Sequence, residues 1–193
     1  MTTSILDIEH LSKSFGHKQV LKDVSFKAQA GHIIGLVGPN GAGKSTIMKA
    51  ILGLFNYPEG KIMVDGEVVS PTSHQSMDQV GALIEYPGIY PFLTGYQHLH
   101  LFSKKTTSDA QVMDIVGKLR MNAYINRKAK TYSLGMKQKL GIALALVNNP
   151  QLVILDEPMN GLDPQSNKDL RNLILSYARS GTTFLISSHI LSE

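Results

Sequence analysis

A glycine-rich segment, residues 38–46, directly follows the short apolar run Ile33–Val37 and constrains the fold more than any other part of this sequence. The segment fits the pattern G-x-x-x-x-G-K-[S/T], in which a loop joins a buried strand to the start of a helix. Its glycines Gly38, Gly41 and Gly43 are expected to take positive φ angles, so that successive backbone N–H groups face one anion. The segment therefore predicts an α/β protein with a phosphate-binding loop.

The side chains of this segment have separate predicted roles. Lys44 is expected to reach the outer phosphates of a nucleotide, and the Ser45 hydroxyl is expected to ligate Mg²⁺. The following helix adds the positive end of its dipole. The alternative, a chance glycine-rich turn, is disfavoured by the strand before the segment and the helical pattern after it. The predicted nucleotide-binding residues here are Gly38, Pro39, Asn40, Gly41, Ala42, Gly43, Lys44, Ser45 and Thr46.

Two adjacent carboxylates, Asp156 and Glu157, follow the continuous apolar run Leu152–Leu155. Such a run is typical of a strand buried on both faces of a parallel sheet, and α/β sheets bind ligands at the carboxyl ends of their strands. We expect Asp156 to hold the Mg²⁺ that Ser45 also ligates, and Glu157 to orient or deprotonate the water that attacks the γ-phosphate. The alternative is a solvated acidic pair in a loop.

Composition limits the class of protein. The 193 residues, 42% of them hydrophobic, suffice for one domain with a small insert, and the absence of cysteine excludes disulfides and thiolate metal sites. No apolar stretch approaches the 18 residues that predict a membrane-spanning helix. The net charge of +4 comes from scattered basic residues, so no nucleic-acid partner is expected.

Hydrophobic periodicity divides the chain into a β-rich part and a helical part. Alternating residues in the N-terminal third predict an antiparallel lobe with a hairpin turn at Asp65 and Gly66. Residues 86–138 are predicted to form a helical insert, in which residues 94–97 and 108–111 each fit a capping box. The apolar residues of the helix after residue 108 are expected to face the β lobe.

The last third is predicted to continue with two helices and a strand. An amphipathic helix is expected to carry Leu140, Leu144 and Val147 and to end at residues 148–150. A second helix is expected to begin at Asp163, with Pro164 in its first turn, and residues 182–186 are expected to form the final strand.

The order of these motifs resembles the ATP-binding subunit of ABC transporters over essentially the whole chain. Residues 38–46 are similar to the Walker A motif of that family, residues 152–157 to Walker B, and residues 132–136 to its signature. The resemblance implies that Ser133 and Gly135 contact the ATP of a partner chain, whereas Leu134 and Met136 depart from the usual signature. It also implies the following roles: a D-loop at Asp163, a switch histidine at His189 that is catalytic together with Lys44 and Glu157, and an adenine-stacking ring at Phe15. For Phe15, a place in the core is an equal alternative.

The resemblance implies a fold and an assembly. The fold is a P-loop NTPase core with a parallel sheet, an N-terminal antiparallel β lobe and a helical insert, together one ATP-binding domain over residues 1–193. Two such chains form a head-to-tail homodimer around ATP and Mg²⁺, attached to a polytopic membrane permease at the cytoplasmic face of the membrane. Family members run on beyond the position of Glu193, so the chain is expected to be truncated at its C-terminus.

Glu85 stands where most of the family has glutamine. With residues 84–88 it resembles the glutamate-loop variant found in self-immunity exporters for bacteriocins (lantibiotics) and in bacitracin-resistance exporters. Glu85 is therefore expected to replace the Q-loop glutamine and to ligate Mg²⁺, unless it is a neutral replacement. The main hypothesis is the ATPase subunit of an exporter of antimicrobial peptides. The alternatives are a soluble ABC ATPase of translation or DNA repair, and a weakly hydrolysing regulatory module.

Overall fold

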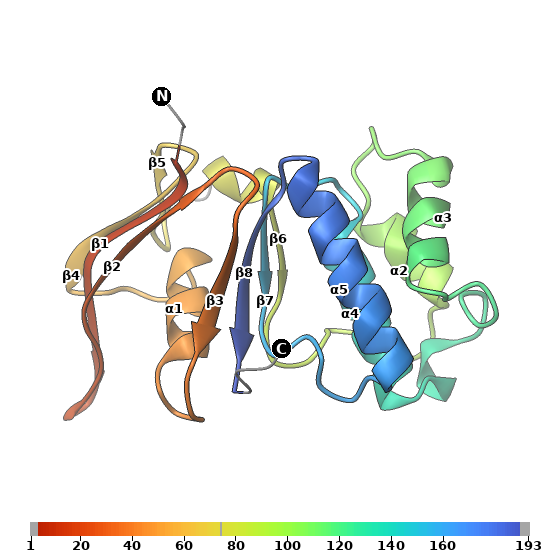
Figure 1. Cartoon of the computed structure of the whole chain (residues 1–193), viewed down its shortest axis with the longest axis horizontal. Coiled ribbons are helices and arrows are strands. Elements are labelled where there is room, and N and C mark those ends of the chain that lie inside the picture. Colours follow the sequence, from red (N-terminus) through yellow and green to blue (C-terminus); the bar gives the residue numbers. More distant parts are fainter. Residues whose placement is uncertain (1–3, 74, 190–193) are drawn as a thin grey trace.

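The computed structural model describes residues 4–73 and 75–189 and contains two four-stranded sheets with helices between and beside them (Figure 1). The first sheet is antiparallel, with the strand order β2-β1-β4-β5. Asp65 and Gly66 turn the chain between β4 and β5 with φ angles of 51° and 79°, which confirms the predicted hairpin. The strands are β1 (Ser4–Phe15), β2 (Lys18–Gln29), β4 (Glu59–Val64) and β5 (Glu67–Val68).

The second sheet is parallel, with the strand order β3-β8-β7-β6, so the carboxyl ends of its strands lie along one edge. Helix α1 (Lys44–Ile51) follows β3 and lies between the two sheets (Figure 1). A 3₁₀ turn, η1 (Gln75–Gln79), leads into β6. The parallel strands are β3 (Ile33–Val37), β6 (Val80–Leu83), β7 (Leu152–Leu155) and β8 (Thr183–Ser188).

The remaining helices cover the side of the parallel sheet that faces away from α1 (Figure 1). Both predicted capping boxes are formed, because the side chains of Thr94 and Ser108 accept from the backbone N–H groups of Gln97 and Gln111. Asp163 is the N-cap of the last helix, also as predicted. These helices are α2 (Gly95–Phe102), α3 (Asp109–Lys118), the 3₁₀ turn η2 (Ala129–Thr131), α4 (Leu134–Leu146) and α5 (Pro164–Arg179).

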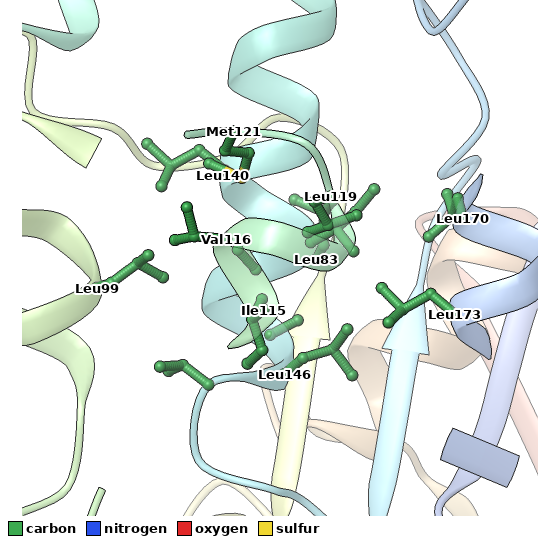
Figure 2. Packing of buried hydrophobic residues seen from close by; sticks show 14 of the residues in the cluster. Leu83, Leu99, Ile115, Val116, Leu119, Met121, Leu140, Leu146, Leu170 and Leu173 are labelled. Atoms are coloured by element: carbon green, nitrogen blue, oxygen red, sulfur yellow. The ribbon is translucent and has the colours of Figure 1, made fainter. Parts of the chain in front are cut away.

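Two packing predictions for the helices are wrong. Helix α4 is not amphipathic, since its buried residues occur on most sides; it packs on β6 and β7 and also contacts α2 and α3. The apolar face of α3 is buried as expected, yet it contacts α4 and not the antiparallel sheet. In Figure 2, Val116 of α3 lies near Leu140 and Ile115 lies near Leu146, and both leucines belong to α4. The helical part is thus built around α4.

The parallel sheet separates two hydrophobic cores. One core lies between the sheets around α1, and the other lies under α2 to α5. Successive residues of β7 enter different cores: Leu152 and Ile154 the first, Val153 and Leu155 the second. The strand is buried at every position, as the continuous apolar run predicts. Because all four side chains of β7 are buried, the position of the acidic pair that directly follows them is fixed relative to the sheet.

Candidate functional site

The loop between β3 and α1 has the tight turns expected of a phosphate-binding loop. Gly41 and Gly43 have φ angles of 82° and 95°, and Gly43 is the N-cap of α1. A Cβ on Gly43 would lie 2.9 Å from Cδ2 of Leu21 and 3.2 Å from the Val20 carbonyl oxygen, so a side chain there would be crowded as well as strained by the backbone conformation. The prediction of a positive φ at Gly38 is wrong. Its N–H donates to the Ser188 carbonyl at 3.3 Å, so Gly38 still continues the pairing of β3 with β8.

Lys44 lies folded along this loop. Its side chain is 9% exposed, and its Nζ donates to the carbonyl of Gly38 at 2.6 Å and to that of Pro39 at 3.3 Å. The same ammonium lies 3.5 Å from Oε1 of Glu157. The lysine thus joins the glycine-rich loop to the carboxylate at the end of β7, although 113 positions separate the two residues in the sequence.

Asp156 is held by two serine hydroxyls. Ser45 Oγ, at the start of α1, donates to Oδ2 of Asp156 at 2.7 Å. Ser187 Oγ, in β8, donates to Oδ1. Only 6% of Asp156 is exposed, so each carboxylate oxygen is fixed by a donor in a buried setting. Ser45 and Asp156, which are predicted to share a Mg²⁺ ion, thus lie side by side and are joined by a direct hydrogen bond, and their role as metal ligands stays a prediction.

Glu157 lies between two cationic or ionisable groups. Its backbone has a φ angle of 47°, in the left-handed region, and its N–H donates to Ser187 Oγ at 2.8 Å. One carboxylate oxygen faces Lys44, and the other accepts from Nδ1 of His189 at 2.8 Å. The unusual backbone conformation turns the chain sharply after Asp156, so the two carboxylates point in different directions.

A pocket of about 340 Å³ lies over this arrangement. Phe15, at the end of β1, stands on its wall with 51% of the residue exposed, so it is not a core residue. Its ring meets Phe55 edge to face at a centroid distance of 5.7 Å. Gly38, Pro39 and His189 do not line the pocket. The residues that do are Phe15, Lys18, Val20, Asn40, Gly41, Ala42, Gly43, Lys44, Ser45, Thr46, Asp156 and Glu157.

Glu85 lies outside this pocket wall. It follows β6 with a φ angle of 60°, and its carboxylate pairs with Nζ of Lys49 on α1. Over residues 4–73 and 75–189, no three or more His, Cys, Asp or Glu side chains form a group that could hold a metal ion. Glu85, Asp156 and Glu157 therefore do not converge as a carboxylate cluster, and a role of Glu85 as a metal ligand stays a prediction.

The signature and D-loop residues form a second group, away from the pocket wall. Ser133 is the N-cap of α4, and its Oγ accepts from the backbone N–H of Met136 at 3.2 Å. Gly135 packs against residue 161, because a Cβ there would lie 2.8 Å from the Gly161 carbonyl. Asp163 caps α5, and the hydroxyl and backbone hydrogen bonds from Ser166 hold the pKa of its carboxyl below the usual value.

Sequence reasoning missed two contributors to the site. Ser187 donates to the Asp156 carboxylate and accepts from the backbone N–H of Glu157, and the only signal for it is a polar residue near the end of an apolar strand. Lys18 lines the pocket from β2, next to Phe15, and no motif marks it. Both residues reach the site through strand pairing, which the local sequence does not encode.

Residues 21–160 match the sequence profile of the ABC transporter family. The chain belongs to this family. In fold, it is similar to a solved structure described as the ATP-binding subunit of an ABC transporter, with a TM-score of 0.88, 32% identity, and coverage of 97% of this chain and 80% of that one.

Curated members of the ABC transporter family are similar over nearly the whole chain. YdbJ of Bacillus subtilis, an uncharacterised ABC transporter ATP-binding protein, is 43% identical, covering 100% of this chain and 64% of YdbJ. The lantibiotic transport ATP-binding protein SrtF of Streptococcus pyogenes is 40% identical, covering 98% and 82% respectively. The bacitracin transport ATP-binding protein BcrA of Enterococcus faecalis is 37% identical, covering 98% and 62%.

The chain thus spans less than two thirds of the length of YdbJ and BcrA. Within the part of the chain that the structure describes, no helix is both long and apolar enough to cross a membrane.

Proposed function

We propose that this chain binds and hydrolyses ATP as part of an ABC exporter. The observation that carries the proposal is the joining of three distant motifs: Lys44 and Ser45 of the loop reach Glu157 and Asp156, and His189, which directly follows β8, reaches Glu157. Phosphate binding follows from the loop, where backbone N–H groups, the α1 N-terminus and the Lys44 ammonium all favour an anion. Phe15 offers an exposed ring face at the pocket for the adenine.

The residues fit a bound Mg²⁺. A hydroxyl oxygen and a carboxylate oxygen, those of Ser45 and Asp156, already lie 2.7 Å apart, and oxygen ligands of this kind are the ones that Mg²⁺ prefers. When bound, the metal supplies charge neutralisation between the outer phosphates. Ser187 holds the other oxygen of Asp156, so the ligand stays oriented.

Glu157 is the residue placed to act on water. Its carboxylate accepts from His189 and lies near Lys44, so it is held in position at the pocket wall. An ionised carboxylate there can orient the attacking water and accept its proton. His189 and Lys44 are positioned to place that carboxylate and to stabilise charge on the transferred phosphate.

A second chain and a membrane protein complete the proposed assembly. Ser133 and Gly135 lie at the N-terminus of α4 and do not line the chain's own pocket, which suits contact with the ATP of a partner in a head-to-tail homodimer. The permease would dock against a groove of about 430 Å³ between β6 and α4, where Tyr86 and Phe102 are exposed. This assembly places the chain at the cytoplasmic face of the membrane.

The proposed cargo is an antimicrobial peptide of the lantibiotic or bacitracin kind. The support is the identity of 40% and 37% with proteins described as lantibiotic and bacitracin transport ATP-binding proteins. Expression of the full-length protein with its permease in a sensitive host should raise the inhibitory concentration of such a peptide. A host that resists none of these peptides would contradict this cargo.

The catalytic proposal is tested by Glu157→Gln in the full-length protein. We expect MgATP binding to persist, while phosphate release falls by about 10² to 10⁴, the usual contribution of a positioned base. Glu67→Gln, at an exposed position on β5, is the control and should match the wild type in both assays. If Glu157→Gln released phosphate as fast as the wild type, the catalytic role of Glu157 would be overturned. If the wild type bound no MgATP, the nucleotide site itself would be overturned.

A further inference from the structure

Glu85 leaves the parallel sheet next to the carboxyl end of β7, where Asp156 and Glu157 follow. Strand β6 pairs with β7 so that Leu83 lies opposite Leu155, and the N–H of Asp156 donates to the Leu83 carbonyl at 2.8 Å. Two residues later the backbone of Glu85 takes a φ angle of 60°. A third carboxylate is therefore delivered to the same edge of the sheet as Asp156 and Glu157.

This third carboxylate is turned away from the nucleotide pocket and toward α1. Its Oε1 is within hydrogen-bond distance of Lys49 Nζ, and it does not line the pocket. Lys49 follows Ser45 by four residues, which places both side chains on one face of α1. The helix thus presents a hydroxyl to Asp156 and, one turn later, an ammonium to Glu85.

We propose that Lys49 is a positioning residue, which holds the Glu85 carboxylate in an ion pair and so keeps a further negative charge away from the metal and the phosphates, in place of the metal-ligand role that the resemblance implied for Glu85. The proposal rests on the nucleotide function proposed above and deepens it. The ion pair also anchors the start of the segment 86–89. The other end of this segment is held by a hydrogen bond, in which the N–H of Tyr90 donates to Nε2 of the buried His98 at 2.9 Å.

The pair acts through placement of charge and contributes little to overall stability. Lys49 and Glu85 side chains are 34% and 59% exposed, and ion pairs in such settings contribute little to the free energy of unfolding. An unpaired carboxylate near the metal site, in contrast, attracts a divalent cation and repels a triphosphate. A charge-placing role of Lys49 should therefore change the response to Mg²⁺ and nucleotide, whereas a merely structural role would change only the stability.

The first experiment follows the segment after Glu85 without any nucleotide. The sequence contains no tryptophan, and Tyr86 is 82% exposed, so Tyr86→Trp gives a single fluorescent reporter beside the pair. In that background Lys49→Met and Glu85→Gln should each lower the tryptophan anisotropy, and the double variant should lower it no further. Lys118→Met is the matched control, because Lys118 forms an ion pair of similar exposure with Asp114 on α3. Additive effects, or an equal effect of the control, would overturn the anchoring role.

The second experiment follows the melting temperature of the full-length protein with nucleotide while the Mg²⁺ concentration is raised. The quantity compared between variants is the midpoint, the Mg²⁺ concentration that gives half of the nucleotide-dependent rise in melting temperature. Lys49→Met should lower this midpoint about threefold to tenfold, because the freed carboxylate attracts the cation. In the Glu85→Gln background the same substitution should leave the midpoint unchanged. An equal shift in both backgrounds would overturn the proposal.

The two experiments separate this proposal from the proposed function. A wild-type protein that shows no nucleotide-dependent change in melting temperature would overturn the proposed function, and the tryptophan reporter would still decide whether Lys49 holds Glu85.

Discussion

Ser187 organises both carboxylates of the site with one hydroxyl group. Its Oγ accepts from the N–H of Glu157 and donates to Oδ1 of Asp156. Ser187 is itself fully buried, so no solvent could replace these hydrogen bonds without a rearrangement. The hydroxyl therefore couples the backbone turn at Glu157 to the orientation of the predicted metal ligand.

Replacing this serine should lower the stability of the protein. Ser187→Ala leaves a buried carboxylate oxygen without its donor, which is expected to lower the free energy of unfolding by about 1–3 kcal/mol. Urea unfolding of the full-length protein measures this change. Ser180→Ala, which removes an exposed hydroxyl at the end of α5, is the control. Equal stability of the two variants would contradict the role of Ser187.

The sequence predicted the site only where local patterns specify the chemistry. Lys44, Ser45, Asp156 and Glu157 could be named because each belongs to a motif of fixed spacing at the end of an apolar run. Ser187 could not be named, because it reaches Asp156 only through the pairing of β8 with β7, which joins residues 31 positions apart. The prediction for Gly38 is wrong for a similar reason, since its backbone continues the pairing of β3 with β8.

At the scale of elements, a glycine brings α4 close to the parallel sheet. A Cβ on Gly81, in β6, would lie only 1.8 Å from the backbone carbonyl oxygen of Ala145. The strand and the helix therefore meet backbone to backbone at this point. This close contact explains why α4 is buried on most sides, a property that its own periodicity did not reveal.

Filling that contact should push α4 away from the sheet. Gly81→Ala is expected to destabilise the protein by about 1–3 kcal/mol, as overpacked cores do. Gly88→Ala is the matched control, because a Cβ there has no atom within 4 Å. The midpoints of urea unfolding compare the two. A Gly81→Ala protein as stable as Gly88→Ala would show that the helix can move without cost.

The N-terminus of α5 should respond to acid through Asp163. Hydrogen bonds from Ser166 hold the pKa of this carboxyl below its ordinary value of 3.8. The ionised cap therefore stabilises the fold above that pH, and this contribution is lost as the pH falls through the lower, folded-state value. Asp163→Asn keeps an oxygen acceptor but not the charge.

We expect the wild type to exceed Asp163→Asn in its urea midpoint at pH 7, and this difference to shrink near pH 3. A difference that is the same at both pH values would contradict the role of the charge.

At the scale of the whole molecule, β7 joins the two hydrophobic cores. Its residues alternate between the core around α1 and the core under α2 to α5, so neither core is complete without the strand. The sequence predicted this double burial from the apolar run, and it predicted both sheets and the helical insert. Its prediction that α3 covers the β lobe is wrong, because the apolar stripe of α3 fits either the β lobe or α4.

A cavity in this strand should destabilise both cores at once. Ile154→Ala removes a fully buried side chain and is expected to cost about 2–5 kcal/mol. Far-UV circular dichroism and tyrosine fluorescence should report one coincident unfolding transition. Leu54→Ala, at a position that is 63% exposed, is the control. Two separated transitions would mean that the cores unfold independently.

The uniform apolarity of β7 has a consequence for mutations that change its length. The strand is only four residues long, so a one-residue slip would bring either Gln151 or Asp156 into a position that is now fully buried. The same slip would carry Asp156 about 3.3 Å along the strand axis, beyond reach of the Ser45 hydroxyl. Insertions or deletions here should therefore lower the free energy of unfolding and separate Asp156 from Ser45 at the same time, so a screen for expression alone would already remove them from a library.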